Sequence, residues 1–502
     1  MSNTLPTPLI PLTNTNYFNW YDAETPTSYT PHSTYFAPYT IKPLSNTLYI
    51  GFSSARPAEW DGGLFAQYTA NNDLQPITIV DEQGFVDLQP SPNNIYIPGV
   101  DPCCPDGWDY GNTYVYTPTT NTFKKYRNLP NVLHSWGIWY DESQSALYTV
   151  TGARTTTTTT PVPDWNRTGQ ILRSFDHGQT WTVLANRDGS AFPGQEGTGD
   201  SVGNHRAYDI IKFNNKLYLS WNDYLLVPPT YIWNICGLAV SDDNGLTWTR
   251  ITDGLEPPLT CRTRLFIHNN HLLTLNNAQD ELVAVNTDGV ITTYPLPFQI
   301  DSWVYNYLAT DNANRLYTVT DDGRIMRTTD FTNPTAWQPI AATNDTFVTL
   351  TYWPHTDQII VASRGTNSNI WALDPATPNL NLPTAPTMTI TLNNNEINLQ
   401  WASSPTISQY HLYHSTTPYN PRVRPTLNSI SGETQYFYQF QTPPTPFLTN
   451  HDSLWQQTSN TTITDTIRNT QFYRIRAGAS PQLSPAPPTM VGAITYSITA
   501  PE

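Results

Sequence analysis

Basic and aromatic side chains stand in pairs just before or within several short strand-like runs of this sequence. The pairs are His134 and Trp136, His205 and Arg206, Arg262 and Arg264, and Trp303 and Tyr305. A pocket that combines such groups suits a sugar, because aromatic rings pack against its C–H faces while polar side chains bind its hydroxyls. The same polar groups could instead pair with Asp209, Asp301 and main-chain carbonyls and fill the centre of the fold. Both interpretations require that the runs converge on one point.

Long polar segments between the runs supply further candidates for binding. They read SSARPAEWDGG, PGVDPCCPDGWDYGN, GARTTTTTTPVPDWNRTG and SWNDYLLVPPTYIWN, and their candidate ligand-binding residues are Arg56, Trp108, Trp165 and Trp221. If each segment joins the second and third strands of a repeated unit, the added length lies on one face of the protein. Long loops on one face of a regular scaffold are typical of a surface that contacts a partner. We expect this long-loop face to bind a glycan or a partner protein.

A repeated eight-residue pattern indicates which elements position these groups. It consists of Ser174, Asp176, Gly178, Thr180 and Trp181, and it recurs as Ser241, Asp243, Gly245, Thr247 and Trp248. We expect a tight turn in which the Asp carboxylate accepts main-chain N–H bonds, Gly adopts a positive φ and Trp packs back on the sheet. The pattern S-x-D-x-G-x-T-W resembles the Asp box, or BNR repeat, of sialidase-like β-propellers. The resemblance implies a propeller in which these ten residues are structural.

A second repeat consists of two strand-like runs joined by a tight turn. Copies include FVDLQPSPNNIYIPGV, WGIWYDESQSALYTVTG and AYDIIKFNNKLYLSW, and about seven units fit between residues 30 and 377. The charged fraction is only 13%, and Thr, Asn and Pro are abundant, which favours short strands and turns over helices. We predict an all-β protein with a seven-bladed propeller, six or eight blades being the alternatives.

The ends of the chain differ from the repeats. Residues 1–30 form a Pro- and Thr-rich arm that we expect to dock on a neighbouring subunit or to close the ring. The propeller is predicted over 31–380. Residues 384–502 follow a Pro-rich linker and resemble a fibronectin type III domain, an immunoglobulin-like β-sandwich, through Trp401 on an early strand and Tyr473 in the tyrosine-corner position.

Charge and cysteine usage exclude several classes of partner. The formal net charge of −16 disfavours nucleic acid, which proteins bind by neutralising phosphates with Lys and Arg. No apolar run is long enough to span a bilayer, and residues 1–30 lack the pattern of a secretion signal. The four cysteines, Cys103, Cys104, Cys236 and Cys261, lack the spacing of a zinc site, and a Cys236–Cys261 disulfide and free thiols are both open. We expect no cofactor and no metal.

The resemblance to sialidases implies a catalytic set that can be compared with the sequence. Three arginines, a Tyr nucleophile with a Glu partner and an Asp acid/base would be needed. Arg206, Arg262 and Arg264 could form part of an arginine cluster, and Tyr305 or Tyr307 could supply the phenol. The first unit, TYFAPYTIKP, lacks the expected Arg-Ile-Pro element, and no Glu stands clearly on an inner strand. We therefore assign no catalytic residue.

Three functions follow from these observations. The preferred one is a noncatalytic recognition or structural protein of a virion, as a phage tail or capsid-associated component, or of a cell surface. It would be extracellular or virion-bound and would bind glycans or partner proteins, neighbouring subunits included, through the long-loop face. The alternatives are an extracellular glycoside hydrolase of sialidase-like type and a purely architectural assembly protein.

Overall fold

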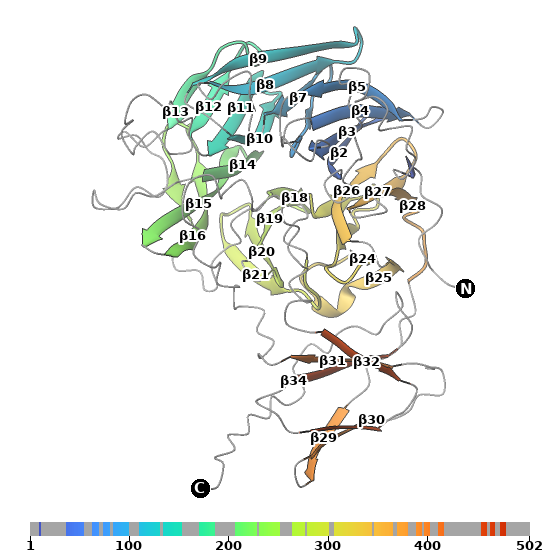
Figure 1. The fold of residues 1–502 in the computed structure, drawn as a ribbon. Helices are drawn as coiled ribbons and strands as arrows, with labels where there is room; N and C mark the ends of the chain where they lie inside the picture. Colours follow the sequence, from blue (N-terminus) through green and yellow to red (C-terminus); the bar gives the residue numbers. More distant parts are fainter. Residues whose placement is uncertain are drawn as a thin grey trace.

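The computed structural model describes residues 10–11, 37–54, 63–69, 74–80, 84–99, 110–130, 134–152, 170–185, 206–227, 230–251, 264–276, 279–300, 306–343, 346–364, 369–379, 388–393, 396–401, 410–415, 453–458, 462–466 and 472–477. The described residues form an all-β protein whose larger part is a ring of seven four-stranded antiparallel blades (Figure 1). The predicted all-β class and seven-bladed propeller are confirmed. Pairing of Gly152 with Arg206 joins the third and fourth blades into one eight-stranded sheet.

The first strand of each blade lies at the centre of the ring (Figure 1). First strands of neighbouring blades contact one another there from the sixth blade through the seventh and first to the fourth. The first three blades are β2 (Pro38–Leu44), β3 (Thr47–Ser54), β4 (Gly63–Thr69) and β5 (Gln75–Val80); β6 (Gln89–Pro90), β7 (Ile95–Pro98), β8 (Tyr110–Thr117) and β9 (Thr122–Pro130); and β10 (His134–Asp141), β11 (Ala146–Gly152), β12 (Ile171–Ser174) and β13 (Thr182–Ala185). The next three are β14 (Arg206–Phe213), β15 (Lys216–Val227), β16 (Thr230–Ser241) and β17 (Thr249–Arg250); β18 (Phe266–His268), β19 (His271–Leu275), β20 (Glu281–Asn286) and β21 (Ile291–Pro295); and β22 (Leu308–Thr310), β23 (Leu316–Val319), β24 (Arg324–Thr328) and β25 (Gln338–Ala342).

The seventh blade takes its outer strand from the start of the chain. Its first three strands are β26 (Thr346–Trp353), β27 (Gln358–Arg364) and β28 (Asn369–Leu373), and the fourth is β1 (Ile10–Pro11). Ile10 pairs with Ile370 and Pro11 with Asn369. A proline is tolerated here because β1 is an edge strand. Part of the predicted N-terminal arm thus closes the ring.

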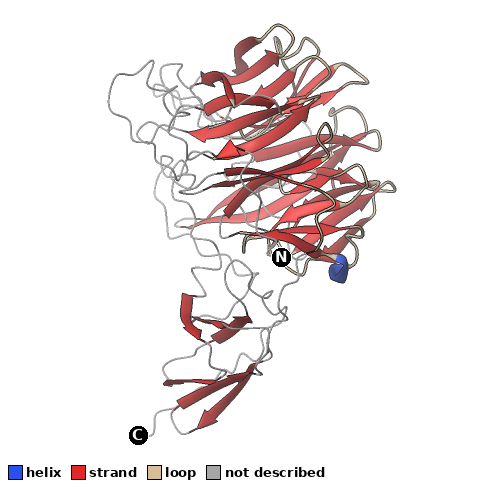
Figure 2. Ribbon diagram, turned by 90° about the vertical axis from the view of Figure 1, so that its right-hand side faces the viewer, coloured by secondary structure: helices blue, strands red, loops and turns tan. Residues whose placement is uncertain are grey.

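The two faces of the propeller differ in their connections. Turns between first and second strands, and between third and fourth strands, are short and emerge together on one side, which we call the short-turn face (Figure 2). Two of these turns are Asn-Asn pairs, Asn214–Asn215 and Asn269–Asn270, with positive φ at both residues, as a two-residue hairpin turn of type I′ requires. The opposite ends of the strands carry the connections from second to third strands and between blades, and they define the long-loop face.

Both copies of the eight-residue pattern form the expected turn between a third and a fourth strand. Asp176 Oδ1 accepts the Thr180 main-chain N–H at 2.8 Å, and Ser174 Oγ accepts that of Gly178 at 2.8 Å. The second copy repeats both bonds at 2.8 Å on Asp243 and Ser241. Gly178 and Gly245 have φ values of 87° and 90°. Trp181 packs on Leu129 and Leu172, so the local geometry follows the expectation drawn from the sequence.

One predicted loop is a pair of strands instead. The segment SWNDYLLVPPTYIWN was expected to be a long loop carrying Trp221, but β15 and β16 pair from Leu217 opposite Ser241 to Val227 opposite Thr230. The expectation was wrong because regular strand pairing continues as far as Val227 and resumes at Thr230. Trp221 is 2% exposed and packs in the apolar core between the third and fourth blades.

The described residues after 387 form two three-stranded sheets. One has the order β29 (Met388–Asn393), β30 (Glu396–Trp401) and β33 (Thr462–Thr466), and the other has β32 (Ser453–Thr458), β31 (Tyr410–Ser415) and β34 (Phe472–Ala477). Trp401 is 3% exposed beside the fully buried Leu399. Across the described part of the chain, no helix has the length and apolarity to cross a bilayer.

Candidate functional site

Bulges at equivalent positions of the innermost strands shape the centre of the ring. The pairing register of β2, β10, β14 and β26 shifts at Tyr39, Trp136, Tyr208 and Val348. A bulge inserts one extra residue and re-aims its side chain. Tyr39, Val86, Trp136 and Tyr208 form an apolar cluster of their own, and the Trp136 and Tyr208 rings lie 5.6 Å apart. The predicted candidate Trp136 is therefore a buried packing residue, 2% exposed.

Arg264 reaches across the channel from the fifth blade to three others. Its Nη2 donates to the carbonyl oxygens of Val86 at 3.0 Å and Trp136 at 2.8 Å, and its Nη1 donates to that of Tyr208 at 3.1 Å. The planar fork of donors in a guanidinium allows one side chain to serve several acceptors. Arg264 thereby joins the second, third and fourth blades to the fifth. The bulges matter here because two of the three carbonyls belong to bulged residues.

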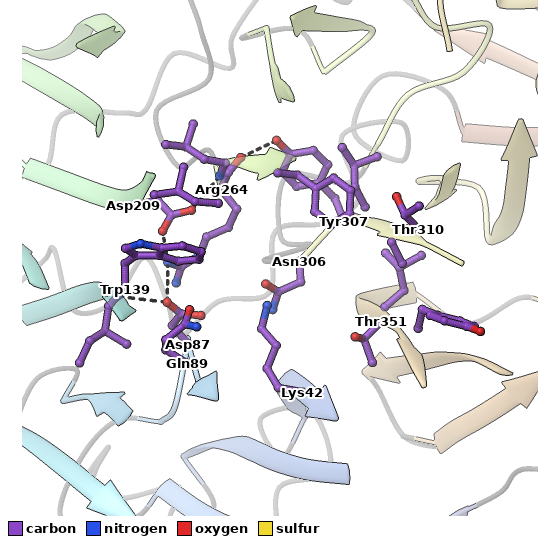
Figure 3. A pocket seen from close by; sticks show the side chains of 18 of the residues that line it. Lys42, Asp87, Gln89, Trp139, Asp209, Arg264, Asn306, Tyr307, Thr310 and Thr351 are labelled. Carbon is purple, nitrogen blue, oxygen red and sulfur yellow. Dashed lines mark hydrogen bonds and ion pairs between the residues drawn. The ribbon is translucent and has the colours of Figure 1, made fainter. Parts of the chain in front are cut away.

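Two carboxylates flank the Arg264 guanidinium. Asp87 Oδ2 and Asp209 Oδ1 each lie 3.5 Å from Nη1 (Figure 3). Asp87 also accepts the main-chain N–H of Ile138 at 3.2 Å, and Asp209 accepts that of Leu265 at 2.7 Å, so each carboxylate bonds to the neighbouring blade. Burial raises the pKa of Asp209 to about 6 and Arg264 opposes this shift, while Asp87 adds to it. The sequence-based alternative, in which these polar groups fill the centre, holds for Arg264 and Asp209.

The remaining side of the channel is held by neutral hydrogen bonds. The Tyr307 hydroxyl donates to the Arg264 carbonyl oxygen at 2.6 Å, and burial raises the pKa of this phenol. Asn306 Nδ2 donates to Thr40 Oγ1 at 3.3 Å and to Thr349 Oγ1 at 3.4 Å. These bonds connect the sixth blade with the fifth, first and seventh. We call Asp87, Asp209, Arg264, Asn306 and Tyr307 the plug layer.

A cavity of about 230 Å³ lies against the plug layer, within the same channel (Figure 3). The plug layer itself forms part of its walls, and the rest comes largely from residues that stand about two positions nearer the short turns. We call four of these residues the cavity layer: Lys42, Gln89, Trp139 and Thr351. All four are partly exposed, so solvent reaches the cavity. Period-two alternation along the strands places both layers on the channel side.

The candidates drawn from the sequence fall into three groups. Trp136, Trp221 and Arg264 are buried in the fold, as described above. His134 and Arg206 begin β10 and β14 at the long-loop face, where the structure describes the backbone alone. The others lie outside the described residues, and they are Arg56, Trp108, Trp165, His205, Arg262, Trp303 and Tyr305.

Sequence reasoning missed Asp87 and the cavity layer. A signal for Asp87 was present, because Val86-Asp87-Leu88 matches Tyr208-Asp209-Ile210 at the same place in the strand-turn-strand repeat. Lys42, Trp139 and Thr351 offered no local signal, since only the closed ring brings their strands together. Among the described residues, no group of three or more His, Cys, Asp or Glu side chains is arranged to hold a metal ion. In the acidic turn at 321–323, Asp322 forms an ion pair with Arg324 at 2.8 Å.

Comparisons with known proteins address the fold alone. No family model matches this sequence, and no curated protein matches it significantly. Among solved structures, a streptogramin B lyase is similar at 12% identity and a TM-score of 0.44, covering 69% of this chain and 96% of that one. The virginiamycin B lyase from Staphylococcus aureus has 13% identity and a TM-score of 0.43, covering 67% and 94%. The Pan2 WD40 domain of Neurospora crassa has 11% identity and a TM-score of 0.43, covering 71% and 94%. At this level of likeness the activities of these proteins say nothing about this chain.

Proposed function

We propose that this protein is a noncatalytic recognition protein that presents the long-loop face of its propeller to a glycan or a partner protein. The observation that carries the proposal is the plug layer. Its guanidinium donates to three main-chain carbonyls and faces two carboxylates, all of them within the ring. Groups bound in this way hold the blades together and leave recognition to the loops at the strand ends.

The sialidase-like alternative would need the same groups for a substrate. An arginine that clamps a substrate carboxylate must present free donors, and a Tyr nucleophile must lose its proton. Arg264 is 7% exposed, and the Tyr307 hydroxyl is bound to a carbonyl while burial raises its pKa. A substrate would therefore have to break bonds that join four blades. This cost favours the recognition function.

We also assign the two regular turns to the Asp-box class and residues 384–502 to a fibronectin type III-like module. The hydrogen bonds of Asp176 and Asp243 support the first assignment. The second is supported by the order of the described strands, in which the first pairs with the second and the second with the fifth, while the third lies between the fourth and the sixth. This order suits a Greek-key sandwich. We place the protein in a virion or cell-surface assembly, extracellular in either case.

A glycan array probed with the full-length protein tests the proposal when released sugar is assayed in parallel. We expect binding without turnover. Arg206→Ala at the long-loop end of β14 should weaken binding at least about tenfold, because a charge-assisted hydrogen bond would be lost. The matched control, Lys216→Ala, lies at the short-turn end of β15 and should leave binding unchanged.

The other outcomes of this assay select between the alternatives. Release of sugar would contradict the proposal and favour the sialidase-like hydrolase. If the protein neither binds a glycan nor releases sugar, glycan recognition is contradicted and a purely architectural protein is favoured. Equal losses in the two variants would mean that the long-loop face is not the binding surface.

A further inference from the structure

The channel cavity beside the plug layer is a second candidate site, separate from the long-loop face. Lys42, Trp139 and Thr351 stand two residues before the ends of β2, β10 and β26, each of which leads into a turn of the short-turn face. The plug layer closes the other end of the cavity. A ligand in this cavity would therefore lie on the side of Arg264 that faces away from the long loops.

Among the described charged groups around the cavity, one cation has no hydrogen-bonded partner in the described part of the chain. All four carboxylate oxygens of Asp87 and Asp209 accept a main-chain N–H, from Leu88, Ile138, Ile210 and Leu265. Arg264 is engaged by carbonyls. Within the part of the chain that the structure describes, the Lys42 ammonium makes no hydrogen bond or ion pair, although it lies close enough to Asp209 to act on it electrostatically. Figure 3 shows Lys42 extending from β2 toward Asn306.

The other wall residues suit a small ligand with a flat apolar face. Trp139, Ile211, Phe266 and Leu350 supply apolar surface to its walls. Thr351 and Gln89 add a hydroxyl and an amide. A volume of about 230 Å³ lies below the roughly 300–1,000 Å³ of pockets that hold drug-sized ligands. The walls and the volume together select a ligand of about ten non-hydrogen atoms.

We propose that this cavity binds a small organic carboxylate, with its carboxylate on the Lys42 ammonium and its apolar ring against Trp139. The ammonium supplies a charge-assisted hydrogen bond, and burial of the ring supplies the apolar contribution. Electrostatic attraction in a partly enclosed channel is stronger than in bulk water. The site is independent of glycan recognition, since its residues belong to the opposite end of the channel.

Benzoate is the probe, and benzamide is its uncharged counterpart of the same shape. Saturation-transfer NMR on the full-length protein should show saturable benzoate binding in the millimolar range, as expected for nine non-hydrogen atoms. Benzamide should bind at least about tenfold more weakly. Lys42→Met should weaken benzoate at least about tenfold and leave benzamide unchanged, because only the charge is removed.

Two further variants keep the test decisive. Lys216→Met removes an exposed lysine from a short turn of the fourth blade and should leave both probes unaffected. Thr351→Leu narrows the cavity and leaves the charge of Lys42 in place, so it should weaken the binding of both benzoate and benzamide. It tests the cavity if Lys42→Met does not fold. Absence of saturable benzoate binding to the unaltered protein would overturn the proposal. Equal binding of benzoate to Lys42→Met, or of benzamide and benzoate to the unaltered protein, would overturn it as well.

Discussion

The plug layer and the cavity layer are consecutive rings of side chains in one channel, yet they use polar groups in opposite ways. In the plug layer Arg264 bonds to three carbonyls, and the two carboxylates beside it each accept main-chain N–H bonds. In the cavity layer Lys42 stands at the edge of a cavity that Trp139 and Phe266 also line. A charged side chain in a propeller centre is thus no sign of a binding site by itself. What distinguishes the two layers is how many partners the fold already provides.

Removal of the plug cation should have the largest effect on stability. Arg264→Met leaves Asp87 and Asp209 buried without their cation and three carbonyls without a donor. We expect a loss of about 3–5 kcal/mol in the free energy of unfolding, measured by urea titration at pH 7. Arg264→Lys should recover only part of this loss, because an ammonium lacks the planar fork. A loss below about 1 kcal/mol for Arg264→Met would mean that the plug does not hold the ring.

The next effect is on the pH dependence of stability, in which Asp209 should differ from Asp176 and Asp243 of the two eight-residue turns. The folded-state pKa of Asp209, about 6, lies above its usual value of 3.8, so the folded protein holds this proton more tightly. Its contribution to stability is present below pH 4 and is lost as the pH rises to about 6, by at most about 3 kcal/mol. Urea titrations from pH 4 to pH 7 should show that Asp209→Asn removes this component. An unchanged pH dependence of the free energy of unfolding in Asp209→Asn would contradict a raised pKa of Asp209.

Asp176 and Asp243 should show the opposite sign. Desolvation acts to raise the pKa of these two carboxyls. Hydrogen bonds from Thr180 to Asp176 and from Thr247 to Asp243 outweigh it and lower both pKa values to about 2. Their stabilising contribution is present above pH 4 and is lost as the pH falls toward 2. Replacement of both by Asn should therefore reduce the fall in the free energy of unfolding between pH 4 and pH 2, measured by urea titration. An equally large fall in the double variant would mean that other groups cause the loss of stability in acid.

Removal of one neutral bond in the plug should have a smaller effect than removal of its charge. Tyr307→Phe deletes the hydroxyl that donates to the Arg264 carbonyl and keeps the buried ring. We expect a loss of about 1–2 kcal/mol in the free energy of unfolding, with no change of its pH dependence between 4 and 7. A loss as large as that of Arg264→Met would shift the main role from the guanidinium to the phenol.

The smallest effect on stability should come from the cavity layer. Lys42→Met should change the free energy of unfolding by less than about 0.5 kcal/mol, because no hydrogen bond within the described residues is lost. The same variant is the one expected to lose benzoate binding. Thermal unfolding and the NMR titration on one preparation check both statements. A large destabilisation would show that Lys42 belongs to the plug.

Local repeats carried most of what the sequence could predict. The turns at Asp176 and Asp243 are set by residues within a span of eight, so their hydrogen bonds followed from spacing alone. The number of blades followed from counting the strand-turn-strand repeat. The pairing of Arg264 with Asp209 was one of two interpretations of the centre, and only the closed ring decides between them.

The errors arose where distant strands meet. Trp221 was placed in a loop because Pro-Pro interrupts its segment, whereas two long strands pair as far as Val227 and Thr230. Lys42 and Trp139 lie far apart in the sequence, and nothing near either residue indicates the other. Their shared cavity depends on bulges and on a ring closed by Ile10 and Pro11, which are features of the whole fold.

A double-mutant cycle between Arg264 and Asp209 tests the central claim most directly. The free energy of unfolding would be measured at pH 7 for the unaltered protein, Arg264→Met, Asp209→Asn and the double variant. If the plug layer acts as one charged network, the two single effects should fail to add by at least about 1 kcal/mol, with the double variant less destabilised than their sum. Additivity within about 0.5 kcal/mol would contradict the account, because Arg264 and Asp209 would then not act as one charged network.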